Sequence, residues 1–203
     1  MELANMHGDI PVPPYIKRVP FSSEYQNVYA KDEGSVAAPT AGFHLTKPLI
    51  AKLKEMGVEF LEVTLHVGLG TFMPIRADEL GAHQMHAEWV EIPDETVAGI
   101  LKAKAERRRV IAVGTTTTRA LEGAVQRCGG KLCAWHGEVN LFIQPGFDFA
   151  VIDGLMTNFH LPKSTLLVLV SAFAGRERIL HAYEEAVAKK YRFYSFGDAM
   201  LIV

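Results

Sequence analysis

Cysteine is scarce in this chain of 203 residues, which has only Cys128 and Cys133. They lie five positions apart, beside Gly129 and Gly130. This spacing is neither a CxxC motif nor the framework of a disulfide-stabilised secreted domain. We therefore expect no disulfide and a cytoplasmic location.

The sequence also lacks a long apolar run. The longest, at 165–174, is about half of the ~20 residues that a transmembrane helix needs. The N-terminus has no basic segment followed by an apolar one, so we expect neither a signal peptide nor a membrane partner. A large excess of one charge is missing too, because the net charge is −2. That balance excludes a histone-like or tail-driven nucleic-acid binder but leaves room for local basic patches.

Hydrophobic residues, by contrast, make up 49% of the chain. A chain of this length is typical of one domain and can bury a core without disulfides or a structural metal. No repeat and no low-complexity segment interrupts it. We expect a single domain over 1–203, with 1–21 as an extended proline-rich lead-in.

Apolar spacing, caps and glycines predict alternating helices and strands. One helix follows Thr46, with Leu49 and Met56 on its apolar face, and closes at Gly57. Further helices are expected at 23–29, 94–107, 116–127, 164–173 and 177–190, and strands at 58–66, 87–92, 110–113, 141–144, 151–156 and 199–203. The alternation predicts an α/β fold, with a mostly parallel sheet or partial barrel and surrounding helices. Ligands of such folds bind where strands end, here near 66–72, 114–119 and 157–162.

The junction at 114–119 is a candidate anion site. Gly114 allows a sharp turn, and Thr115 and Thr116 add hydroxyl groups to the free N–H groups of a helix start. Ordinary N-capping by threonine explains the same residues. Arg119 and Glu122, three positions apart, form a solvated ion pair unless they are buried.

Three groups of histidines are candidate functional residues. His66 is followed by Gly68 and Gly70, which leave space for a ligand, and His44 lies in a glycine-containing loop. Both are equally explained as structural histidines. His83 and His86 with Glu88 suggest a metal site, but residues three apart on a strand face opposite ways, which disfavours it.

Other polar residues lie near the C-terminal strands. Ser164, close to His160, is better explained as a helix cap than as a nucleophile. Asp198 is either a turn residue or a carboxylate that lies at the same edge of the sheet as the other candidate residues at strand ends. Two basic clusters are either solvated helix ends or an RNA phosphate track: Arg107, Arg108 and Arg109, and Lys189, Lys190 and Arg192.

Nine ordered blocks together resemble one family, the S-adenosylmethionine:tRNA ribosyltransferase-isomerases of queuosine biosynthesis. The blocks are 11–16, 25–29, 36–42 with His44, 64–72, 85–86, 109–116 with Arg119, 142–146, 157–162 with 171–175, and 191–200. They cover nearly the whole chain. Family members also have a long N-terminal portion with an inserted small β-barrel, which this sequence lacks; it resembles the C-terminal part of the main α/β domain.

The resemblance implies transfer and isomerisation of the ribosyl group of S-adenosylmethionine. The implied acceptor is 7-aminomethyl-7-deazaguanine in a tRNA anticodon, and the products are epoxyqueuosine-tRNA, adenine and methionine. No metal or redox cofactor is implied beyond S-adenosylmethionine as substrate. His66 is expected as general acid or base, with His160 or Asp198 as its partner.

The same resemblance implies the substrate-binding residues. Gly114, Thr115 and Thr116 would cradle the methionine carboxylate and Arg119 would contact an anion, while His44, Gly68, Gly70 and Asn158 would complete the site. Two rival hypotheses are a non-catalytic tRNA-binding fragment and a metal-dependent hydrolase built on His83, His86 and Glu88.

Overall fold

The computed structural model describes residues 12, 16, 24–32, 34–35, 37–68, 85 and 87–203. The predicted lead-in at 1–21 therefore lies almost entirely outside the described residues. The elements, in chain order, are η1 (Thr40–His44, a 3-10 helix), α2 (Lys47–Glu55), β1 (Thr64–His66), β2 (Glu88–Ile92), α3 (Asp94–Ala105), β3 (Ile111–Val113), α4 (Thr115–Arg127), β4 (Trp135–Val139), β5 (Gly154–Asn158), α5 (Thr165–Ala174), α6 (Arg176–Ala188) and β6 (Ala199–Ile202).

The strands form two small sheets, with the orders β1-β2-β4 and β3-β5-β6. The α/β class is confirmed, but the expected mostly parallel pairing is wrong for these sheets. Among the strands of the described residues only β3 and β5 pair in parallel, whereas β1–β2, β2–β4 and β5–β6 are antiparallel. Alternating helices and strands predict parallel pairing only when successive strands join the same sheet. Here successive strands alternate between the sheets, since one sheet contains β2 and β4 and the other contains β3 and β5.

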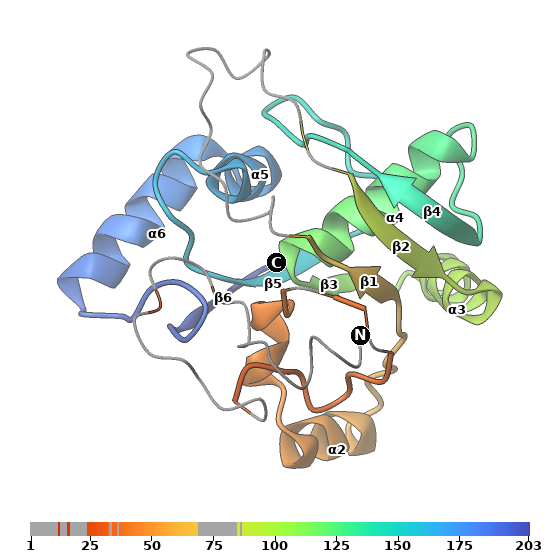
Figure 1. Cartoon of the computed structure of the whole chain (residues 1–203), viewed down its shortest axis with the longest axis horizontal. Helices are drawn as coiled ribbons and strands as arrows, with labels where there is room; N and C mark the ends of the chain where they lie inside the picture. Colours follow the sequence, from red (N-terminus) through yellow and green to blue (C-terminus); the bar gives the residue numbers. More distant parts are fainter. Residues whose placement is uncertain are drawn as a thin grey trace, which may run out of the picture.

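Helix α4 lies between the two sheets (Figure 1). On one side Ala120 packs with Val90 of β2 and Val139 of β4. On the other, Leu121 and Ala124 join the larger core that includes Leu155 of β5. Small residues allow this close approach, and a side chain at Gly123 would overlap Val139. The central helix thus fixes both sheets relative to each other.

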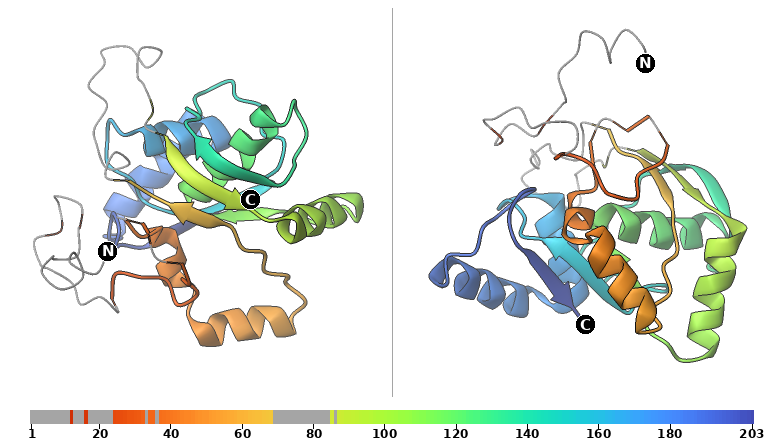
Figure 2. Two further views of the ribbon diagram at one scale, coloured as in Figure 1. Left: turned by 45° about the vertical axis from the view of Figure 1, so that its right-hand side comes forward. Right: turned by 90° about the horizontal axis from the view of Figure 1, so that it is seen from below.

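Helices α3 and α6 flank this centre on opposite sides, and α5 packs against α6 (Figures 1 and 2). The predicted caps are confirmed: Ser164 Oγ accepts from the N–H of Leu167 at 3.2 Å, and Thr46 Oγ1 from that of Leu49 at 3.4 Å. In the part of the chain that the structure describes, no helix is long and apolar enough to cross a bilayer.

Several predicted elements were wrong. Residues 24–29 form turns rather than a helix, 141–144 lie in no strand, and the strand expected at 58–66 is reduced to β1. Strand β4 was not predicted because Gly137 and polar residues interrupt its pattern. The expected apolar face of α2 is not buried, since Leu49 and Met56 are 39% and 72% exposed.

The two cysteines are also not separate thiols, as the structure pairs Cys128 with Cys133 in a disulfide whose Cα atoms are 6.2 Å apart. Cys128 follows the end of α4, where Gly129 and Gly130 take φ values of +66° and +93°. This left-handed turn folds the chain back on itself. Spacing alone did not reveal the pairing because the turn decides it.

Candidate functional site

The side chain of Asn158, at the carboxyl end of β5, joins two polar residues from a distant part of the chain. Its Oδ1 accepts a hydrogen bond from Thr40 Oγ1 at 2.9 Å, and its Nδ2 donates to His44 Nε2 at 3.0 Å. Asn158 is 4% exposed, so these partners satisfy an amide that water hardly reaches. The amide therefore fixes η1 against the end of the strand.

The same contact sets the protonation of His44. Because Nε2 accepts from the amide, the ring proton of the neutral form lies on Nδ1. Burial lowers the pKa of His44 below its ordinary value; Asp198 opposes this effect and Arg192 adds to it. His44 is therefore a neutral imidazole at pH 7, and its one acceptor nitrogen, Nε2, is engaged by the Asn158 amide.

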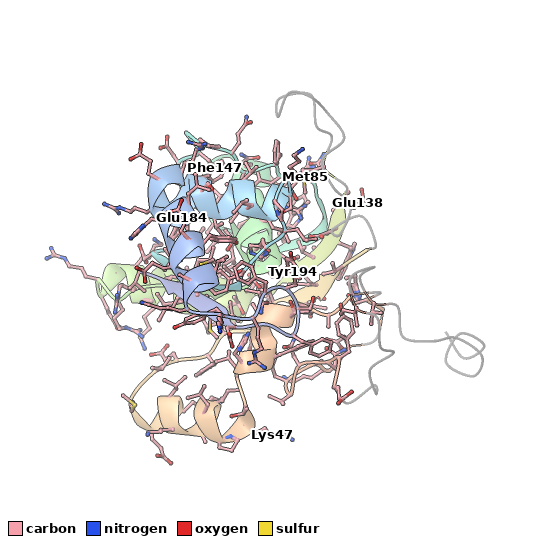
Figure 3. The ribbon with its side chains drawn as sticks, turned by 90° about the vertical axis from the view of Figure 1, so that its left-hand side faces the viewer. Lys47, Met85, Glu138, Phe147, Glu184 and Tyr194 are labelled. Carbon is pink, nitrogen blue, oxygen red and sulfur yellow. A yellow bond between two sulfur atoms is a disulfide. The ribbon has the colours of Figure 1, made fainter. Side chains whose placement is uncertain are left out.

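Asp198 lies beside this histidine, just before Ala199, whose register partner is Asn158. Its Oδ1 accepts from Arg192 Nη2 at 2.9 Å, and its Oδ2 from the Arg192 backbone N–H at 2.7 Å. These hydrogen bonds lower the pKa of Asp198. These hydrogen bonds close the loop between α6 and β6, in which Figure 3 labels Tyr194. Asp198 is thus an ionised carboxylate near His44.

Aromatic and amide side chains from residues 25–29 and Phe196 also pack against η1. The rings of Phe43 and Phe196 lie 5.9 Å apart, and Tyr25 is within 6 Å of both. The side-chain oxygens of Asn27 and Tyr29 approach Gly42 so closely that a Cβ there would overlap them. Burial raises the pKa of Tyr29 to about 12, so its phenol stays neutral.

The predicted anion site at residues 114–116 lies against η1. Gly114 has φ +95° and donates its N–H to the Met156 carbonyl at 2.8 Å. A Cβ on Gly114 would be 3.8 Å from that of Ala41 in η1. No described side chain caps α4, and both Thr115 and Thr116 at its start are buried. The structure therefore brings the helix start, η1 and Asn158 together.

His66 packs against the part of the chain that leads into η1. Its ring lies 4.9 Å from that of Trp89 and against Gly34. Among the described residues its buried Nδ1 has no hydrogen-bond partner. Ser35 Oγ accepts from the N–H of Val67 at 2.9 Å, so residues 34–44 connect His66 to the Asn158 contacts. Gly68 is exposed, and Gly70 lies outside the described residues.

His160 lies apart from this group. Its Nε2 is 2.9 Å from Thr157 Oγ1, and its backbone N–H donates to Tyr183 Oη at 2.7 Å. Neighbouring residues of a strand face opposite ways, so Thr157 and Asn158 hold different partners. Burial lowers the pKa of His160 to about 4, which keeps it neutral.

Arg119 and Glu122 do not form the predicted solvated pair. Both are buried; Arg119 Nη1 donates to Glu88 at 3.1 Å and its Nε to the Leu141 carbonyl at 3.0 Å. Glu122 instead accepts three backbone N–H bonds, from residues 150–152, at 2.9–3.1 Å. Glu88, one residue of the metal hypothesis, is thus bonded to an arginine, and His83 and His86 lie outside the described residues.

The two basic clusters lie at opposite ends of the β3-β5-β6 sheet. Arg109 comes just before β3, whereas Arg192 precedes β6, which starts beside the carboxyl end of β5. Lys189 pairs with Glu185 at 2.6 Å and Arg192 with Asp198. The clusters therefore do not form one continuous track along a single edge.

These contacts define an α/β protein with a polar site at the carboxyl ends of its parallel strands. The model of the family described as queuosine biosynthesis protein matches residues 1–202, and the chain belongs to this family. It is 57% identical over its full length to the S-adenosylmethionine:tRNA ribosyltransferase-isomerase of Carboxydothermus hydrogenoformans, and 55% to that of Acaryochloris marina.

A solved structure gives the same result. The crystal structure of S-adenosylmethionine tRNA ribosyltransferase from Thermotoga maritima matches with a TM-score of 0.67 and 47% identity, over 80% of this chain and 51% of that one. The chain spans 60% and 54% of the length of the two curated relatives. Family membership and the resemblance drawn from the sequence are thus confirmed.

Sequence reasoning assigned no role to Thr40, Asn27, Tyr29 or Ser35. All four lie in or near the blocks 25–29 and 36–42, which carried the family resemblance. That signal marked the segment without showing what its side chains contact.

Proposed function

We propose that the chain carries the reaction centre of an S-adenosylmethionine:tRNA ribosyltransferase-isomerase. It would move the ribosyl group of S-adenosylmethionine to 7-aminomethyl-7-deazaguanine in a tRNA anticodon, giving epoxyqueuosine-tRNA, adenine and methionine. The observation that supports this most is the pair of hydrogen bonds by which Asn158 holds neutral His44 beside the Asp198 carboxylate, in a chain of this family.

The chemistry needs proton transfer at defined points. The sulfonium of the donor acidifies its neighbouring C–H bonds, so a neutral histidine is a strong enough base to begin. Adenine leaves more readily once protonated, and the amine of the modified base then adds to the opened sugar. An oxyanion finally displaces methionine and closes the epoxide. This step requires hydrogen-bond donors positioned to stabilise the negative charge of the oxyanion.

We assign proton transfer to His66 and to His44, whose Nε2 must leave the Asn158 amide to accept a proton, with the ionised Asp198 carboxylate as their partner. Asp198 suits this role better than His160, because His160 is bonded to Thr157, whose side chain faces away from that of Asn158. Gly114, Thr115 and Thr116 cradle the donor carboxylate at the start of α4. Arg119, bonded to Glu88, acts by positioning rather than by direct contact with an anion.

The transfer is balanced without an external oxidant or reductant, so the proposal includes no cofactor beyond S-adenosylmethionine itself. The tRNA would be held by phosphate contacts from the two basic clusters, Arg107–Arg109 and Lys189, Lys190 and Arg192. A cytoplasmic location belongs to the same proposal.

One specific observation favours a second candidate, a non-catalytic tRNA-binding fragment. The chain spans only 54–60% of the curated relatives' length. In this case RNA would bind but the donor would not be consumed.

The test is product analysis after incubating the chain with S-adenosylmethionine and tRNA that carries the aminomethyl base. The full-length Carboxydothermus relative serves as positive control. We expect free adenine, detected by chromatography. S-adenosylhomocysteine without adenine would contradict ribosyl transfer, and RNA binding without any donor turnover would favour the second candidate.

A further inference from the structure

A basic pocket lies at the opposite end of the β3-β5-β6 sheet from Asn158, where β3 and β5 begin. It has a volume of about 310 Å³ and is lined by Lys104, Arg107, Arg108, Arg109 and Asp153. Four cationic side chains and one carboxylate face this space. The lining alone therefore has an excess of positive charge.

The carboxylate is already engaged. Asp153 Oδ2 accepts the Val110 N–H at 2.8 Å, and its Oδ1 lies 3.6 Å from Lys104 Nζ. Because Asp153 is paired with Lys104 and with a backbone donor, it does little to neutralise the arginines. Its role is to close the start of β3 against the start of β5.

The three arginines are not equivalent. Arg108 forms ion pairs with Glu59 at 3.1 Å and Glu106 at 2.7 Å. For Arg107 and Arg109, no acidic partner lies within ion-pair distance among the residues that the structure describes. Arg107 and Arg109 are thus the cations that remain available to a ligand.

The turn that carries them explains their position. Arg107 takes φ +57°, and the N–H of Arg108 donates to the Ala103 carbonyl at 2.8 Å, which ends α3 with a left-handed residue. A cation in the last turn of a helix is commonly explained by the helix dipole. Arg109 lies beyond that turn, next to β3, so the dipole does not account for it.

The pocket is too far from the reaction centre to hold the donor. Asp153 immediately precedes β5 and Asn158 ends it. At about 3.3 Å per residue, these two residues are about 16 Å apart along the strand. A ligand bound in the pocket is therefore either a separate molecule or another part of a long substrate.

We infer that this pocket binds a phosphate group through Arg107 and Arg109. The planar guanidinium presents paired donors that match phosphate oxygens, and two unpaired arginines supply the charge. The preferred source is the backbone of the RNA whose modified base lies near Asn158, which rests on the proposed function. A free phosphate compound would use the same contacts.

The first experiment needs no RNA and no activity. Inorganic phosphate is titrated into the chain while NMR follows the backbone amides of residues 107–110. We expect a saturable shift in the wild type and at least about tenfold weaker binding in the double variant Arg107→Gln/Arg109→Gln, from loss of hydrogen bonds to a charged group. Arg127→Gln, which removes an exposed arginine outside the pocket, should bind as the wild type does.

The second experiment measures the affinity for a tRNA anticodon stem-loop by fluorescence anisotropy. If the RNA backbone is the source, the double variant should bind about 10- to 100-fold more weakly. Its plot of log affinity against log salt should flatten by about 0.7–0.9 for each lost phosphate contact. Arg127→Gln again serves as a control, because it removes one positive charge outside the pocket.

The outcomes separate the sources. Saturable phosphate binding together with weakened RNA binding supports an RNA backbone site, and phosphate binding with unchanged RNA affinity supports a small phosphate compound. A wild type without a saturable response to phosphate overturns the inference, whatever the RNA result. Failure of the proposed function would appear separately, as absence of adenine release.

Discussion

Replacing Asn158 with aspartate tests how the site sets the charge of His44. The carboxylate can still accept from Thr40, but it places an acceptor where Nδ2 now donates to His44 Nε2 at 3.0 Å. Two acceptors cannot share a hydrogen bond, so Nε2 must carry a proton in this variant, and the added negative charge favours the doubly protonated ring. An opposite charge this close raises a histidine pKa by about 1–3, or about 1.4–4 kcal/mol in favour of the imidazolium.

We expect the pKa of His44, which burial now lowers, to move above its ordinary value in Asn158→Asp. Titration of the ring nitrogens by heteronuclear NMR measures it directly. Thr40→Val is the matched control, because it removes the other hydrogen bond to Asn158 without adding charge. A His44 pKa that is unchanged or lower in Asn158→Asp would refute the inference that the amide donates to this ring.

The same variant has a functional consequence. An imidazolium at pH 7 has no free nitrogen to accept a proton, and loss of a general base typically slows a reaction by 10²- to 10⁴-fold. We expect adenine release to fall in proportion to the fraction of His44 that is protonated at pH 7, at most to the low end of this range, while circular dichroism shows an intact fold. Normal turnover with a protonated His44 would leave His66 as the base.

The remaining predictions concern stability and the separation of roles. Since burial holds the pKa of His160 at about 4, its neutral form stabilises the fold above pH 6.5, and this contribution is lost as the pH falls towards 4. Between pH 7 and 4.5 the loss is about 2–3 kcal/mol in urea unfolding; His160→Gln should lose correspondingly less, and equal losses would contradict the assignment. Glu122→Ala leaves three backbone N–H groups unpaired and should cost at least about 3 kcal/mol, whereas Glu138→Ala on the surface (Figure 3) should change the unfolding free energy by less than about 0.5 kcal/mol. In steady-state assays, His66→Ala should lower turnover by about 10²- to 10⁴-fold with donor binding kept, while Thr116→Val should weaken donor binding by about 1–3 kcal/mol; identical kinetic profiles would contradict their separate roles.

Local signals predicted the local structure well. Caps at Thr46 and Ser164, and the glycine turn before α4, depend on neighbouring residues, and the structure confirms them. The alternation at 87–92 likewise predicted β2. The division of strands between two sheets was not predictable. It depends on strand pairing, which is set by how the helices pack between distant parts of the chain.

The site divides in the same way. A position next to a predicted strand identified Asn158 and Asp198 as candidates, and a glycine-containing loop identified His44. Their partners, such as Thr40, come from 118 positions away in the sequence, and a single sequence holds no direct signal of that distance. Arg119 shows the converse, since a charged residue that suggested an anion contact is buried against Glu88.

The most direct test of the central claim follows the atoms of the donor. S-adenosylmethionine labelled with ¹⁴C in the ribose, and separately in the methyl group, is incubated with the chain and with tRNA that carries the aminomethyl base. The account predicts that ribose label enters the RNA while methyl label leaves with methionine. Methyl label in the RNA, with the ribose label remaining in S-adenosylhomocysteine, would contradict it.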